Sequence, residues 1–495
     1  MSHNFYILAI LYLFRPILLT KIFEGSLVAS LVTNLNLIGY KKCFVNELLE
    51  SLKHLDSLTS LRTSPETGVT VDMVTTDEVL KNMATIKELE YVEIKLQDES
   101  INKLILLVNS IKHIERLGIK VTPTEESDLS SLHLLENLNR LDTLKSFSLY
   151  GESISEEIIS SFVKIMPNLE SISIRSLLKT NMIRSLKHTL PSTVRCLELG
   201  KVADPSELVM EFFEERHSQR LTKLHLELDK SCVLSPEQLI SLLNVQSEQL
   251  EEILISGIDL RKEFASEELK KLPALHKITF RRLANYDPPP LKFWQVVLKH
   301  LGENLTHLHI EDGMLPENLG DIIGTYCSNV SNFSARNTTM DTLSITQLVK
   351  KIGKNLHTLN LCQTEIGEYG INSVLTFCGN VEDLNLSNIY GSPYLDPMVF
   401  AGVFLKRQGE KLRALRVDGL PINNMLFKML VKTSTNSLET LSFTNNQCIS
   451  DLELRELVEK CHHLKIIHIS ENPDGHEGLT QGLILDIEDQ FIHTN

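Results

Sequence analysis

The chain has 495 residues and a formal net charge of −15 at pH 7. Hydrophobic residues make up 42% and charged residues 23% of it, which excludes a disordered, collagen-like or wholly membrane-embedded chain. The excess of acidic over basic residues argues against a surface that broadly binds nucleic acid or anionic lipid. No two of the eight cysteines are separated by two residues, so neither a disulfide scaffold nor a zinc site is predicted. A reducing location, cytoplasmic or nuclear, is favoured.

The N-terminus carries an apolar run from Phe5 to Phe14. No Lys or Arg precedes it, and no small-residue cleavage site follows soon, as a signal peptide would require. Arg15 and Lys21 interrupt the run before about 20 apolar residues, the length of a membrane-spanning helix. We therefore expect a buried helix and no membrane association, with a signal, an anchor or a gene-model artefact as the alternatives.

Residues 14–23 have the sequence Phe-Arg-Pro-Ile-Leu-Leu-Thr-Lys-Ile-Phe. This segment resembles the opening of an F-box, the motif with which a family of proteins docks a small adaptor of a ubiquitin ligase. The resemblance implies that five side chains of this segment bind the adaptor. Those that fit the motif are Pro16, Leu18, Leu19, Ile22 and Phe23, whereas Arg15 and Ile17 depart from it and its glutamate is missing.

From residue 58 to about residue 475 a single pattern recurs, in which an apolar residue is followed by others three and five positions later. Fifteen copies succeed one another at intervals of 25–31 residues, and Leu58 with Leu61 forms a degenerate copy before them. Such a period is the signature of a stacked repeat protein. The copies open at Leu89, Ile114, Leu144, Leu169, Val194, Leu221, Leu250, Leu275, Leu305, Val330, Leu356, Val381, Leu412, Leu438 and Leu464.

Each copy predicts a strand followed by a helix. Its last two apolar residues, such as Leu359 and Leu361, are two apart and so face the same side of a strand. Helical spacing follows, as in residues 366–375 and 452–458. Because so short a unit cannot bury its apolar side alone, the copies must stack into an α/β solenoid, with a curved parallel sheet on the concave face and helices on the convex face.

The third residue before the strand-opening position marks where the preceding helix ends. Glycine in several copies predicts a left-handed helix cap there, and cysteine replaces it in others, so that two kinds of turn alternate. The glycines are Gly302, Gly353 and Gly409, and the cysteines are Cys327, Cys378 and Cys461.

This pattern resembles the leucine-rich repeats, and most closely the cysteine-containing kind of the F-box proteins, to which residues 449–469 are similar. That family places Asn or Cys eight residues after the opening position, and here Asn446 and Asn472 fit. Ile258 and Thr338 are among the residues that replace it elsewhere, so we do not expect the usual ladder of buried polar side chains along the turns.

Four regions are expected: a helical N-terminal segment with a degenerate F-box (residues 1–48), a cap or degenerate repeat (49–88), a solenoid of about fifteen repeats (89–475) and a C-terminal cap or tail (476–495). The resemblance implies a substrate-recognition subunit of a ubiquitin ligase, whose solenoid selects the protein to be ubiquitinated. The alternative is a leucine-rich-repeat scaffold or regulator without an F-box, for instance one that acts on a small GTPase.

No enzyme motif is found. The sequence holds no phosphate-binding loop, serine-hydrolase elbow, His-Glu-x-x-His helix or kinase signature. We therefore expect a protein that is not an enzyme, with no catalytic residue, cofactor or metal. Trp294, which follows the prolines of residues 288–290, would either anchor a partner or, as we expect, pack on a convex helix.

Side chains between and just after the paired apolar residues would lie on the concave surface, because side chains alternate along a strand. The position between them is polar and mixed, and includes His309 and Arg416. The position after them is rich in Lys and Arg, which predicts a groove for an acidic or phosphorylated segment of a substrate protein, although solvated strands often carry such residues without function. These basic residues are Lys95, Lys120, Arg175, Arg281 and Arg336.

Overall fold

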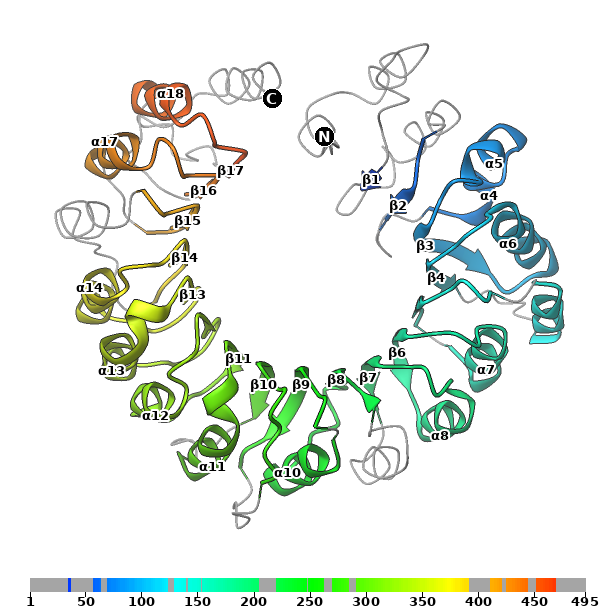
Figure 1. Ribbon diagram of the computed structural model, residues 1–495, viewed down its shortest axis with the longest axis horizontal. Coiled ribbons are helices and arrows are strands. Elements are labelled where there is room, and N and C mark those ends of the chain that lie inside the picture. Colours follow the sequence, from blue (N-terminus) through cyan, green and yellow to red (C-terminus); the bar gives the residue numbers. More distant parts are fainter. Residues whose placement is uncertain are drawn as a thin grey trace. The chain divides into compact units, whose positions relative to one another are not determined.

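A computed structural model describes residues 34–36, 57–63, 69–122, 129–138, 141–152, 154–203, 220–246, 248–261, 269–284, 291–390, 410–420, 424–443 and 451–468. The chain forms two compact units, Met1–Cys232 and Val233–Asn495, both built from the same repeat of a strand and a helix. Within each unit the strands lie side by side on the concave side and the helices stand on the convex side (Figure 1). The predicted leucine-rich-repeat solenoid is confirmed.

In the first unit each strand pairs in parallel with the next, from β1 to β8. Its elements are β1 (Asn34–Asn36), β2 (Ser60–Arg62), α4 (Val71–Val74), α5 (Asp77–Met83), β3 (Glu88–Lys95), α6 (Asp98–Ser110), β4 (Arg116–Thr122), the 3-10 helix η3 (Leu129–Asn137), β5 (Ser146–Tyr150), α7 (Glu156–Lys164), β6 (Ser171–Leu178), α8 (Thr180–Thr189), β7 (Cys196–Val202) and β8 (Lys223–Leu228).

In the second unit the parallel pairing runs from β9 to β17. Its elements are α10 (Pro236–Val245), β9 (Glu252–Asp259), β10 (Lys277–Ala284), α11 (Leu291–Leu301), η5 (Gly302–Asn304), β11 (His307–Gly313), α12 (Leu319–Tyr326), β12 (Asn332–Ser334), α13 (Thr342–Ile352), η6 (Gly353–Asn355), β13 (Thr358–Asn360), α14 (Glu368–Phe377), β14 (Asp383–Asn385), β15 (Ala414–Arg416), α17 (Asn424–Thr433), β16 (Thr440–Ser442), α18 (Asp451–Lys460) and β17 (Ile466–His468).

The sheet of the first unit begins earlier than predicted. Strand β1 pairs in parallel with β2, and Leu58 and Leu61 beside β2 are buried. An added strand satisfies the backbone groups at the edge of β2, which would otherwise need water or another partner. The prediction of a helical segment is therefore wrong at residues 34–36, and the rest of residues 1–48 lies outside the described residues.

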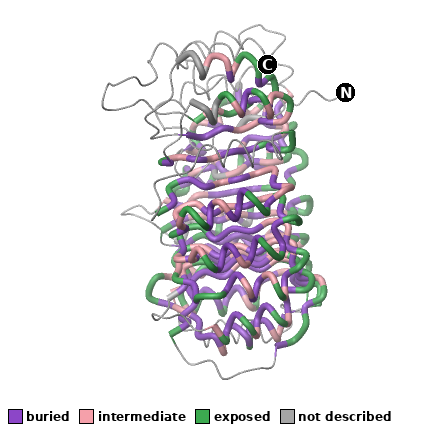
Figure 2. The backbone as a smooth tube through the Cα atoms, turned by 90° about the vertical axis from the view of Figure 1, so that its left-hand side faces the viewer, coloured by how far each residue is buried: buried purple, intermediate pink, exposed green. Residues whose placement is uncertain are grey.

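The core lies between strands and helices. Paired apolar residues of the strands point into it, and Leu359, Leu361, Leu384 and Leu386 are fully buried. Buried stretches recur through the stacked repeats (Figure 2). Trp294 of α11 is also fully buried, with its ring centroid 5.8 Å from that of Phe280 in β10, so its packing on a convex helix is confirmed.

The glycine turns differ from the prediction. Gly353 has φ −55° and ψ −29°, a right-handed conformation, and begins the short helix η6. A Cβ at this position would lie 2.9 Å from the carbonyl oxygen of Phe377 and 3.4 Å from the Sγ of Cys378. The predicted left-handed cap is therefore wrong, and glycine is present because the next repeat approaches too closely for a side chain.

The helix-end cysteines are core residues. Cys327 and Cys378 are fully buried and Cys461 nearly so. Burial raises the pKa of the Cys327 and Cys378 thiols to about 12 and that of Cys461 to about 11. These thiols stay protonated at neutral pH and serve as small apolar side chains.

A left-handed residue stands seven positions after the opening residue in eight described repeats, where the chain leaves the strand. At the next position, Thr338 and Thr364 donate their hydroxyls to the carbonyl oxygens of Ala335 and Leu361, at 2.7 and 2.6 Å. In these two repeats a buried threonine hydroxyl therefore satisfies a backbone carbonyl at the turn. The left-handed residues are Lys201, Gly257, Arg282, Asp312, Asn337, Gln363, Asn388 and Gly419.

Candidate partner-binding surface

The side chains between the paired apolar residues form one continuous row in each unit, which we call the inner row. Strand pairing aligns them one to one, so each strand from β4 onward contributes one residue, and the predicted strand phase is confirmed for these strands. The row contains Gly118, Ser148, Ser173, Glu198 and His225 in the first unit, and Leu254, Thr279, His309, Ser334, Asn360, Asn385, Arg416, Ser442 and His468 in the second.

The phase predicted for the first repeat is wrong. A register shift between Leu89 and Val92 places Glu93 beside Lys120 and moves Lys95 beside Thr122. The repeat opens at Ile86 instead, because the backbone N–H of Lys87 bonds the carbonyl of Thr59 as the corresponding residues do in the repeats that follow. Lys95 therefore does not continue the row of Lys120.

The predicted basic residues are divided between the units, with three in the first and two in the second. Three of these five residues, and Arg416 of the position between the paired apolar residues, form ion pairs with carboxylates on a neighbouring strand. Such pairs at a partly exposed surface contribute little to stability, but they fix side-chain positions and cancel charge. The pairs are Lys120–Glu93 (3.1 Å), Arg175–Glu198 (2.8 Å), Arg281–Glu311 (2.9 Å) and Arg416–Asp383 (2.6 Å).

Lys95 and Arg336 differ from the others. Both are exposed, and neither side chain forms a hydrogen bond or an ion pair with any residue that the structure describes. In the second unit, Arg336 is thus the cation of the predicted column that is available to a partner. Its positive charge acts on the half-buried thiol of Cys362 in the next repeat.

Three histidines gather on β11 and just before β10, of which the sequence analysis singled out only His309. The ring centroid of His307 lies 6.3 Å from that of His309 and 6.5 Å from that of His276. Burial, aided by the positive charges of Lys277, His307 and Arg281, lowers the pKa of His309 to about 4. Burial, Lys277 and His276 also lower the pKa of His307. At neutral pH the two imidazoles are therefore uncharged and can both donate and accept hydrogen bonds.

The carboxylate of Asp418 binds two serine side chains on the polar surface beyond β14. It accepts hydrogen bonds from the hydroxyls of Ser387, at 2.9 Å, and Ser442, at 2.7 Å. On the inner row, Asn360 and Asn385 accept bonds from backbone N–H groups two residues further on, at 3.1 and 3.0 Å. The sequence did not single out Asp418, because only the strand register shows that two serines converge on it.

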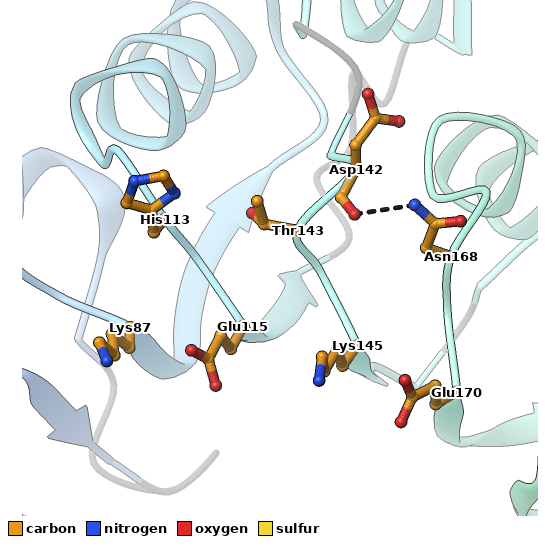
Figure 3. A pocket seen from close by; sticks show the side chains of 8 residues that line it. All are labelled: Lys87, His113, Glu115, Asp142, Thr143, Lys145, Asn168 and Glu170. Atoms are coloured by element: carbon orange, nitrogen blue, oxygen red, sulfur yellow. Dashed lines mark hydrogen bonds between the residues drawn. The ribbon is translucent and has the colours of Figure 1, made fainter.

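The first unit also has a shallow hollow of about 470 Å³ beside the starts of β4, β5 and β6. Lys87, Glu115, Lys145 and Glu170 line it in succession, so that positive and negative charges alternate (Figure 3). The N–H group of the Asn168 side chain donates to the carbonyl oxygen of Asp142 at 2.9 Å on its upper side. Alternating charges give the hollow no preference for a ligand of one sign.

Several predicted features lie elsewhere or are absent from the described part of the chain. The adaptor-docking residues Pro16, Leu18, Leu19, Ile22 and Phe23 are outside it. Within the described ranges, no three His, Cys, Asp or Glu side chains are grouped so that they could hold a metal ion. No helix among the described residues is long and apolar enough to cross a membrane.

No protein-family model and no curated protein matches the sequence. Two solved structures are similar to this chain, each at 13% sequence identity. The internalin inlF of Listeria monocytogenes str. 4b F2365 has a TM-score of 0.38, covering 79% of this chain and 89% of its own. The complex of Rad7 and Elc1 in yeast has a TM-score of 0.36, covering 94% of this chain and 91% of the matched chain.

Proposed function

We propose that the protein is a non-catalytic protein-binding module that holds its partner on the strand surface of its repeats. The observation that carries this proposal is the inner row of the second unit, which runs in register from Leu254 to His468. Such a row offers many small polar contacts spread over neighbouring repeats. That arrangement suits an extended protein surface, whereas small molecules are held in enclosed, mostly apolar pockets.

The ion pairs on the strand surface indicate which charges a partner would carry. Arg281 and Arg416 already neutralise carboxylates, so a uniformly acidic partner would also meet Glu311 and Asp383. A partner with both charge signs fits better. We propose that Arg336 contacts a carboxylate or phosphate group of that partner, because a guanidinium can bind either with two hydrogen bonds.

A narrower proposal concerns the assembly in which the module acts. We propose that it is the substrate-recognition subunit of a ubiquitin ligase of the F-box type. The resemblance of residues 14–23 to an F-box and the cysteine turns support this. The competing proposal is a leucine-rich-repeat scaffold or regulator, which would not need the adaptor.

A binding experiment with the purified F-box adaptor separates the two. The full chain is compared with a Leu18→Ala, Leu19→Ala variant, because truncation at residue 48 would also remove β1, which pairs with β2. Capture of the adaptor by the wild-type chain and its loss in the variant supports the ligase subunit. A wild-type chain that does not bind the adaptor supports the scaffold.

The strand surface is tested by affinity capture from cell extract with matched charge reversals. Arg336→Glu changes an exposed cation on the strand side, and Lys299→Glu makes the same change on α11. We expect proteins captured by the wild type to be lost with Arg336→Glu and retained with Lys299→Glu. Retention with both variants would exclude this part of the surface.

A further inference from the structure

Three large apolar side chains are exposed on the edge of the second unit where strands lead into helices. Leu343 lies in the first turn of α13, Tyr369 in the first turn of α14, and Tyr390 in the turn after β14. Their exposed fractions are 56%, 66% and 51%. We call these three residues the turn-side patch.

Hydrogen bonds place the three residues on adjoining turns. The N–H of Gly367, two residues before Tyr369, donates to the hydroxyl of Thr342, the neighbour of Leu343, at 2.9 Å. The N–H of Tyr390 donates to the carbonyl of Thr364 at 2.8 Å. The three residues therefore lie on the turns of three successive repeats, outside the strands that carry the inner row.

The fold does not require apolar residues at the two helix positions. In α6, α7 and α10 the second residue of the helix is a glutamate. A carboxylate there interacts favourably with the positive end of the helix dipole. Leu343 and Tyr369 occupy this position in α13 and α14, where they forgo that interaction and leave apolar surface in water.

The charges around the patch have one sign. Residues 312–319, 337–346, 363–370 and 387–390 contain no Lys or Arg. Glu317, Glu365 and Glu368 are exposed, and Asp341 caps α13 by accepting the N–H of Ser344 at 2.7 Å. An apolar centre with acidic surroundings is complementary to a basic segment that also carries apolar side chains.

We propose that the turn-side patch docks a basic amphipathic segment of a partner protein. The apolar side chains of the segment cover Leu343, Tyr369 and Tyr390, and its Lys or Arg residues pair with Glu365 and Glu368. Carboxylates repel nucleic acid and anionic membranes, and a second copy of this chain would bring a net charge of −15. The patch thus provides a second binding surface, whose existence does not depend on the proposed function of the strand surface.

The test measures binding of a fluorescein-labelled amphipathic peptide of leucine and lysine to the full chain. A peptide with every lysine replaced by glutamate is the charge control. We expect Leu343→Ser with Tyr369→Ser to weaken binding of the lysine peptide at least about tenfold, as for truncated interface anchors. Glu365→Gln with Glu368→Gln should weaken it and flatten its dependence on salt.

Matched variants separate the patch from general attraction to an acidic protein. Leu106→Ser changes another exposed leucine, on α6, and Glu251→Gln with Glu303→Gln removes two exposed carboxylates elsewhere. Both should bind the lysine peptide as the wild type does. Equal loss in the control variants, or equal binding of the glutamate peptide, would overturn the proposal. So would capture of the chain by phosphatidylserine vesicles that depends on Tyr369.

Discussion

Gly302 lies so close to Cys327 of the following repeat that a Cβ on the glycine would come within 2.8 Å of the cysteine Sγ. It would also lie 2.7 Å from the carbonyl oxygen of Tyr326. The same contact recurs 51 residues later between Gly353 and Cys378. The alternation of glycine and cysteine turns is therefore a packing relationship between neighbouring repeats.

Gly302→Ala is expected to destabilise the second unit by about 1–3 kcal/mol, the usual cost of adding a methyl group to a well-packed interior. Urea unfolding of the full chain measures this cost. Gly367→Ala is the control, because its Cβ would meet only the Thr342 hydroxyl, at 3.1 Å, and a side chain can yield more easily than a backbone. An equal effect of the two substitutions would contradict the steric explanation.

The two sides of a strand should respond oppositely to charge. Leu359→Asp or Leu384→Asp places a carboxylate in the apolar core and should unfold the local repeats, at a cost of several kcal/mol. Asn360→Asp and Asn385→Asp should be tolerated, since a carboxylate can accept the same backbone N–H bonds. Proteolysis and circular dichroism distinguish these outcomes, and equal tolerance of all four variants would mean that the strand sides are inverted.

Acidification should destabilise the second unit through His309. The folded state lowers the pKa of this imidazole to about 4, whereas the unfolded chain has the ordinary value of about 6.5. The unfolded state therefore binds the proton more tightly, and stability that is fully present above about pH 6.5 is lost as the pH falls towards 4. Between pH 7 and pH 5 the wild type should lose up to about 2 kcal/mol more stability than His309→Gln.

Denaturant unfolding at several pH values measures this difference. The two chains compared at pH 8 provide the control, because the imidazole is neutral in both states there and only packing differs. Parallel pH profiles for wild type and variant would show that His309 takes up its proton without loss of the folded state.

Replacing a left-handed residue at the turn after a strand by glycine should stabilise the chain, because glycine adopts this conformation without strain. Gln363 has φ +57°, a conformation that costs a residue with a side chain roughly 1 kcal/mol or more. Gln363→Gly is expected to raise stability, although the greater freedom of glycine in the unfolded chain offsets part of the gain. Asn388→Gly should gain less, since asparagine tolerates this region better. Thermal unfolding measures both variants, and a loss of stability in both would show that backbone strain is unimportant here.

The sequence predicted the solenoid because its period depends on local alternation and on a repeat length that the residues display directly. Leu359 and Leu361 could be assigned to the core on this ground. The partners of charged side chains were not predictable in the same way. Lys120 and Glu93 are 27 residues apart, and only the register shift in β3 places them 3.1 Å from each other.

The sequence predicted which residues lie on the candidate surface, but it did not predict which of their charges are neutralised by ion pairs. Alternation correctly placed Arg281 and Arg336 on the strand side, but it could not show that Glu311 pairs with Arg281 while Arg336 stays available to a partner. The turn-side patch escaped prediction because exposed leucine and tyrosine at a helix start resemble core residues until burial is known.

The one-to-one pairing of strands has a consequence for how the chain can change in length. Repeats of 25 and 31 residues contribute the same number of positions to the inner row, because β14 pairs in the same register with β13 and with β15. Successive residues of the inner row therefore keep a constant spacing of about 4.7–4.9 Å, which backbone hydrogen bonding between strands sets. Insertions and deletions away from the strands can therefore accumulate while the spacing that the inner row offers to a partner stays the same.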